Sequence, residues 1–294
     1  MCAIFGLLTL LGSGLIGIPV PWLALTQVSS PVTSPVADVS STRDQLRLIS
    51  DYVVYYGQGR MDDLARFDLA IIQPETLDAG DRAELRASGT LVVAYLSLGE
   101  VEPYRPWYDD GRVNPDWILG ENPNWGSYYI DTTEAGWQAL MVDIAGDYLA
   151  QGFDGIFMDT LDTVDLFPET TPGMIATVEA LRKAYPQALL IQNRGFTVLD
   201  ATAPSIDALM FEDLSTSYNF DTDTYITAEN DALAARLSEI KANTGLVILA
   251  LDYVAPGDTD SARRARDIAR SYGFIPAVAE ITLETIPDYD LDTP

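Results

Sequence analysis

Eight short apolar segments, most of them separated by stretches with helical periodicity, constrain the fold of this chain more than any other feature. They lie at residues 52–56, 69–72, 91–96, 155–159, 188–192, 208–212, 246–252 and 274–279. Continuous apolar runs of this length are typical of parallel strands that are buried on both faces. Amphipathic stretches between them, such as 134–150, predict covering helices. Eight strand–helix units within about 250 residues therefore predict a single-domain α/β fold, the (β/α)8 TIM barrel.

Two of these segments end in an acidic residue. Asp159 follows the apolar run 156–158, and Glu212 follows the run 208–211. An ionised carboxylate is costly to bury without a partner, and the carboxyl ends of barrel strands are where catalytic groups converge. We expect Asp159 and Glu212 to be catalytic. The structural alternatives are that Asp159 caps the next loop and that Glu212 pairs with a barrel arginine.

Polar side chains at the other strand ends should meet at the same mouth of the barrel. The predicted substrate-binding residues are Tyr55, Gln58, Tyr95, Glu100, Asp162, Asn193, Arg194, Asp252 and Tyr253. Five of them also have a structural alternative. Asp162 would cap a helix, Glu100 would be a solvated loop acid, Arg194 would balance the charge of the acids, and Asp252 and Tyr253 would make structural hydrogen bonds. Three tryptophans, Trp107, Trp117 and Trp125, either stack on sugar rings or pack a long loop predicted at 109–124.

The residue types that the chain lacks exclude several kinds of catalysis. It contains no histidine, and its one cysteine is Cys2. Ser-His-Asp and Cys-His hydrolases and histidine-based zinc sites are therefore excluded. Carboxylates, tyrosines and a few arginines remain, and we expect neither a metal nor a cofactor.

Charge is strongly unbalanced, with 44 acidic against 17 basic residues and a formal net charge of -27. Nucleic acid and anionic lipid surfaces are therefore poor partners. The simpler explanation of the acidity is a solvated acidic surface. The alternative is an electrostatic field that attracts a cationic substrate.

The N-terminal region has the composition of an exported protein. Residues 1–27 are apolar and uncharged, which indicates a signal peptide or an N-terminal anchor, and 28–43 form a Ser/Pro-rich linker. The barrel is expected over 44–286 and an acidic tail over 287–294. We predict a secreted or cell-surface protein that contacts a membrane only through an uncleaved leader.

Several segments together resemble glycoside hydrolase family 114, the endo-α-1,4-polygalactosaminidase-like TIM barrels. They are Tyr55-Tyr56-Gly57-Gln58, the stretches 67–72 and 93–100, Phe153-Asp154-Gly155 through Asp159 and Asp162, Gln192-Asn193 and Phe211-Glu212. The resemblance implies that Asp159 and Glu212 are the catalytic acids. Where fungal members carry Asp-Pro-Asp-Asn, this chain has Phe157-Met158-Asp159-Thr160, which places it nearer the bacterial branch.

The main hypothesis is an exported glycoside hydrolase that cleaves a galactosamine-rich polysaccharide, which is cationic where its amines are free. Asp159 would be the nucleophile and Glu212 the general acid/base; carboxyl groups about 5 Å apart would indicate retention and about 8 Å inversion. One alternative is a non-catalytic carbohydrate-binding barrel at the cell surface. Another is a metal-dependent aldolase or isomerase on the same barrel, which the lack of histidine disfavours.

Overall fold

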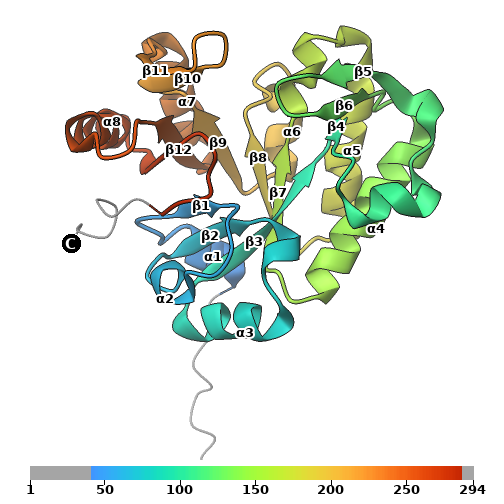
Figure 1. Cartoon of the computed structure of the whole chain (residues 1–294), viewed down its shortest axis with the longest axis horizontal. Coiled ribbons are helices and arrows are strands. Elements are labelled where there is room, and N and C mark those ends of the chain that lie inside the picture. Colours follow the sequence, from blue (N-terminus) through green and yellow to red (C-terminus); the bar gives the residue numbers. More distant parts are fainter. Residues whose placement is uncertain (1–40, 287–294) are drawn as a thin grey trace, which may run out of the picture. The chain divides into compact units, whose positions relative to one another are not determined.

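A computed structural model describes residues 41–286 of the chain. Eight parallel strands, each paired with the next, form a nearly closed barrel (Figure 1). They are β1 (Val53–Tyr55), β2 (Leu69–Ile72), β3 (Leu91–Ser97), β7 (Gly155–Asp159), β8 (Leu189–Asn193), β9 (Ala208–Glu212), β12 (Val247–Tyr253) and β13 (Ile275–Ala279). Each predicted apolar segment overlaps one of these strands, which confirms the predicted fold class. Beyond β13, the Tyr56 N–H donates to the Leu283 carbonyl across the remaining gap, at 2.7 Å.

The strands are buried on both faces because their apolar side chains alternate between two layers. Leu69 and Ile71 of β2 face a cluster that receives residues from all eight strands and fills the barrel interior. Ala70 and Ile72 face the second cluster, between the strands and the outer helices. This alternation explains why the strands read as continuous apolar runs.

Helices occupy most of the connections between strands. They are α1 (Thr42–Leu46), α2 (Met61–Leu64), α3 (Ala79–Ser88), α4 (Ala135–Ala150), α5 (Thr171–Ala184), α6 (Leu199–Thr202), α7 (Asp231–Thr244) and α8 (Thr259–Ser271). Short helical turns are η1 (Pro74–Thr76), η2 (Tyr108–Arg112), η3 (Pro115–Trp117), η4 (Leu161–Asp165), η5 (Pro168–Thr170) and η6 (Ala203–Ser205). Among the described residues, no helix is long and apolar enough to cross a membrane.

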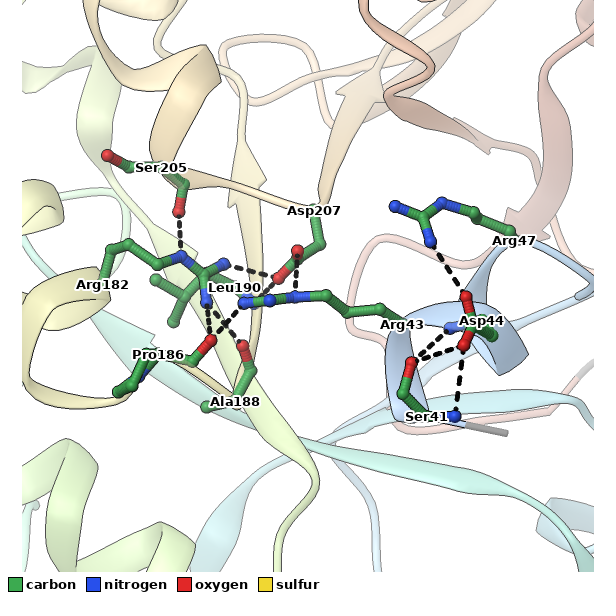
Figure 2. Close-up of polar contacts among 10 residues, drawn as sticks. All are labelled: Ser41, Arg43, Asp44, Arg47, Arg182, Pro186, Ala188, Leu190, Ser205 and Asp207. Atoms are coloured by element: carbon green, nitrogen blue, oxygen red, sulfur yellow. Dashed lines mark hydrogen bonds and ion pairs between the residues drawn. The ribbon is translucent and has the colours of Figure 1, made fainter. Parts of the chain in front are cut away.

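Helix α1 is anchored to the amino-terminal end of the barrel. Leu46 joins the interior cluster, and the Arg43 guanidinium pairs with Asp207 at 2.8 Å and donates to the Pro186 carbonyl at 2.6 Å (Figure 2). Arg182 holds the other oxygen of Asp207 at 2.6 Å. Thr42 and Arg43, predicted as linker, therefore belong to a helix that Ser41 caps. The predicted leader (1–27), the linker up to residue 40 and the tail (287–294) lie outside the described residues.

Two excursions rise from the carboxyl-terminal end of the barrel (Figure 1). One is a three-stranded antiparallel sheet of β4 (Glu100–Val101), β5 (Ile118–Asn122) and β6 (Ser127–Ile130); the other is the hairpin of β10 (Thr216–Asn219) and β11 (Thr224–Thr227). The prediction of a long loop at 109–124 is therefore wrong in part, because strand β5, in the second half of this segment, pairs with β6. That pairing depends on residues beyond the segment, which its Trp, Pro, Asn and Gly content does not indicate.

Candidate active site

Three neighbouring strands end in polar residues that meet at the mouth of the barrel. Asp159, Asn193 and Glu212 are the last residues of β7, β8 and β9. The residues that follow them, Thr160, Arg194 and Asp213, all have left-handed backbone conformations, with φ of 63°, 49° and 63°. Such conformations cost non-glycine residues roughly 1–3 kcal/mol and cluster at functional sites. Their occurrence at three adjacent strand ends indicates that these strand ends form a functional site.

The Asn193 side chain joins the two acids. Its Nδ2 donates to Asp159 Oδ1 at 2.7 Å and to Glu212 Oε1 at 2.9 Å. The two accepting oxygens are therefore no more than about 5.6 Å apart, the combined length of those bonds. An ionised carboxylate only accepts, so the amide presents its NH2 group to the pair as long as one of the two acids is ionised.

The environments of the two acids affect the two pKa values differently. Burial raises the pKa of Glu212 to about 8, and the charges of Asp159 and Asp213 contribute to that rise. Burial also raises the pKa of Asp159, but hydrogen bonds from Asn193 and Tyr95 oppose that rise by stabilising the ionised form. Because the Asp159 charge is among the causes of the raised pKa of Glu212, we infer that Glu212 keeps its proton to higher pH than Asp159, the order that a general acid and a nucleophile require.

Tyr95 supports Asp159 from β3. Its hydroxyl donates to Asp159 Oδ2 at 2.8 Å, and burial raises its pKa well above the ordinary value, so it remains a donor. The ring meets Tyr56 edge to face, with centroids 5.3 Å apart, and the Arg105 guanidinium lies 5.1 Å from its centroid.

Hydrogen bonds and ion pairs fix the Arg105 side chain next to that ring. Its side chain is only 2% exposed and pairs with Glu102 through two nitrogens, at 3.1 and 3.2 Å. A third nitrogen donates to Gln73 at 2.7 Å and Glu75 at 3.0 Å. The position of Tyr95 therefore rests on a buried ion-pair network.

Arg194 lies on the other side of the site. It donates to Asp162 and to Asp213, both at 3.1 Å. The structure thus brings together the predicted residues Arg194 and Asp162 and shows that they pair with each other. The pairing offsets part of the negative charge beside Glu212.

A cavity of about 600 Å³ opens over the acid pair. Seven carboxylates and one arginine line it: Glu100, Glu102, Asp159, Asp162, Asp165, Glu212, Asp213 and Arg194. The predicted residues Tyr95, Asn193 and Tyr253 line it as well. Glu100 is buried and accepts hydrogen bonds from Ser127 and from Asn122. Among the described residues, no group of three or more acidic or cysteine side chains is placed to hold a metal ion.

Three predicted substrate-binding residues lie away from the cavity. Tyr55 packs in the outer layer and donates to the Gln58 carbonyl at 2.8 Å, while the Gln58 side chain is exposed. Tyr56 lines the cavity instead, because successive strand residues face opposite sides. Asp252 is 1% exposed and accepts from the backbone N–H groups of Ser215 and Thr216, so it holds the segment after β9.

Most of the cavity residues that come from the two excursions were not predicted from the sequence. They are Tyr104, Asn122, Ser127, Tyr129, Ser217, Tyr218 and Phe220. The concentration of tyrosine around 128–129 and 218–225 is the one signal that could have pointed to them. Of the three tryptophans, Trp125 lines the cavity, whereas Trp107 and Trp117 pack against Trp137.

Comparisons with known proteins agree with the fold. The sequence model of Glycoside-hydrolase family GH114 matches residues 35–292. An uncharacterized protein of Deinococcus radiodurans is 30% identical over 288 residues, covering 88% of this chain and 89% of that protein.

Two solved structures share the architecture. The glycoside hydrolase domain of PelA from Pseudomonas aeruginosa is 26% identical with a TM-score of 0.73, covering 81% of this chain and 97% of that one. Ega3 of Aspergillus fumigatus, in complex with galactosamine, is 16% identical with a TM-score of 0.65, covering 80% of this chain and 92% of that one. The second likeness shows the fold alone.

Proposed function

The chain belongs to glycoside hydrolase family GH114, and from this premise we propose that it hydrolyses a galactosamine-rich polysaccharide with Asp159 and Glu212. The observation that carries the assignment is the Asn193 amide, which binds both acids at once, at 2.7 and 2.9 Å. Retaining glycosidases place their two carboxyl groups about 5–5.5 Å apart, and inverting enzymes about 6.5–9.5 Å. The upper limit of about 5.6 Å between the nearest oxygens supports retention.

The proposed reaction has two steps. Ionised Asp159 attacks the anomeric carbon while protonated Glu212 gives its proton to the departing glycosidic oxygen, which leaves a covalent glycosyl–Asp159 ester. Glu212, now ionised, then takes a proton from water as the water attacks the same carbon and releases Asp159. Tyr95 and Asn193 stabilise the Asp159 carboxylate before attack and after release.

The charge of the cavity supports a cationic amino sugar as the substrate. Seven carboxylates and one arginine leave the site strongly negative even when Glu212 is protonated. Such a field attracts ammonium groups and disfavours anionic sugars. A polymer of galactosamine with free amines meets this requirement, and endo-α-1,4-polygalactosaminidase activity is the specific form that we propose.

The test compares wild type with Asp159→Asn and Glu212→Gln on de-N-acetylated and fully N-acetylated galactosamine polymers. Reducing ends are counted and products are weighed by mass spectrometry. Loss of either acid should lower the rate of reducing-end release by about 10²- to 10⁴-fold. Asp260→Asn, on the exposed face of α8, is the matched control and should keep full activity. Full activity in both site variants would refute the assignment.

A non-catalytic sugar-binding barrel makes a different prediction. It requires that the wild-type protein bind the polymer and release no reducing ends. The raised pKa of Glu212 beside a second acid favours catalysis, because a site that only binds sugar does not require it.

We also propose that the protein is exported, with residues 1–27 acting as a signal peptide or anchor and 28–40 as a linker. The proposal rests on the apolar, uncharged composition of 1–27. Fractionation of the native host and N-terminal sequencing of the mature protein test it. Cytoplasmic protein with an intact N-terminus would contradict it.

A further inference from the structure

Two exposed aromatic side chains from different excursions meet at the edge of the cavity. Trp125, in the turn between β5 and β6, is 58% exposed, and Phe220, in the turn between β10 and β11, is 44% exposed. Their rings meet edge to face with centroids 5.3 Å apart, and both line the cavity that contains Asp159 and Glu212.

Neither turn needs its aromatic residue for its own conformation. In the first, Asn122 accepts from the Asn124 N–H through its side chain and from the Gly126 N–H through its carbonyl. In the second, the Asn219 side chain accepts from the N–H groups of Asp221 and Thr222. Asparagine thus shapes both turns, so Trp125 and Phe220 call for another explanation.

Contacts with other aromatic rings also hold Phe220 in place. Its ring meets Tyr218 edge to face at 5.2 Å, and Tyr218 meets Tyr225 in the same way at 5.0 Å. The Tyr225 hydroxyl accepts from the Ile281 N–H at 3.3 Å, which ties the row to the segment after β13. A preorganised aromatic surface binds a ligand with less loss of conformational freedom.

We propose that Trp125 and Phe220, together the aromatic rim, form a stacking subsite for a sugar ring distant from the bond that is cleaved. The proposal rests on the proposed function, because the ligand is a further unit of the same polymer. The apolar C–H face of a pyranose would lie on the indole, while the acids below hold the ammonium groups. The rim therefore recognises ring shape and chain length, whereas the acid-lined floor recognises charge.

The test measures the affinity of Glu212→Gln protein, in which turnover is blocked, for galactosamine oligomers of increasing length by calorimetry. Adding Trp125→Ala should weaken the binding of long oligomers about tenfold, since aromatic contacts of this kind contribute on that order. The loss should grow with chain length, and Trp125→Tyr should recover much of it. Phe220→Ala should give a smaller loss with the same dependence on length.

The control is Leu119→Ala, on strand β5 that leads into the Trp125 turn; Leu119 is 38% exposed and does not line the cavity. It should leave the affinity unchanged at every length. An equal loss for all lengths in Trp125→Ala, or no loss, would overturn the subsite.

The inference and the proposed function can fail separately. Binding is measured without turnover, so it is independent of cleavage. If wild-type protein cleaves nothing but Trp125→Ala still weakens the binding of long oligomers most, the subsite is supported and the hydrolase proposal is rejected. Cleavage by wild type with unchanged affinity in Trp125→Ala would reject the subsite alone. Failure of Glu212→Gln to bind any galactosamine oligomer would reject the subsite as well.

Discussion

Replacing Tyr95 by Phe isolates one hydrogen bond to the proposed nucleophile. The ring should stay where it is, because Tyr56 and Arg105 hold it by contacts that phenylalanine also makes. What is lost is the 2.8 Å bond from the hydroxyl to Asp159 Oδ2. A hydrogen bond to an ionised group contributes about 1.5–3 kcal/mol.

The lost hydrogen bond stabilised the ionised form of Asp159, so the pKa of this carboxyl group rises. Since the nucleophile must be ionised, the acidic limb of the kcat/KM–pH profile moves to higher pH. On that limb the rate should fall roughly 10- to 150-fold, because each 1.36 kcal/mol corresponds to a factor of ten. At pH values above the acidic limbs of both proteins, where Asp159 is ionised in each, the fall should be much smaller.

The assay is a pH series of kcat/KM on a galactosamine polymer, with Tyr253→Phe as the control. Tyr253 also lines the cavity but, among the described residues, donates no hydrogen bond to Asp159. Its variant should leave the acidic limb in place. An equal loss for Tyr95→Phe at every pH would show that Tyr95 acts on the substrate and refute the reasoning.

Three further predictions concern the same buried groups. As the pH rises, kcat/KM should decrease around pH 8, because burial raises the pKa of Glu212 to about 8 and the general acid must be protonated. A decrease that is already centred near pH 5 would contradict this. In the folded protein Glu212 keeps its proton to higher pH than in the unfolded chain, so its contribution to stability is full at low pH and is lost between about pH 4.5 and 8. Urea titrations should therefore find Glu212→Gln a few kcal/mol more stable than wild type at pH 8 and not at pH 4, whereas exposed Glu169→Gln should show no such difference. Arg105→Met should lower the free energy of unfolding by about 3–5 kcal/mol, because it strands the buried Glu102 carboxylate. Arg112→Met, which breaks only a surface pair with Asp110, should stay within about 1 kcal/mol.

The barrel could be predicted from sequence because its signals are local. Each strand carries its own apolar run, since both faces are buried, and Asp159 and Glu212 each end such a run. The carboxyl-terminal ends of parallel strands share one edge, so the meeting of these acids follows from topology alone. The family resemblance, which the GH114 match confirms, points to the same fold.

The remainder of the site depends on contacts that the sequence does not encode locally. Tyr55 and Tyr56 are adjacent and alike, and only the register of β1 decides that Tyr56 faces the cavity. Asp252 ends an apolar run as Glu212 does, yet it satisfies the backbone of the neighbouring segment. Trp125 and Phe220 are 95 residues apart in the sequence and meet only because two excursions fold toward each other.

The central claim is that Asp159 and Glu212, joined by Asn193, are close enough for a covalent mechanism. Proton NMR of the first product released from a galactosamine oligomer tests it most directly, because the spectrum reports the anomeric configuration before mutarotation. We expect the same configuration as that of the bond that was cleaved. The opposite configuration would require an attacking water between the two acids and would contradict it.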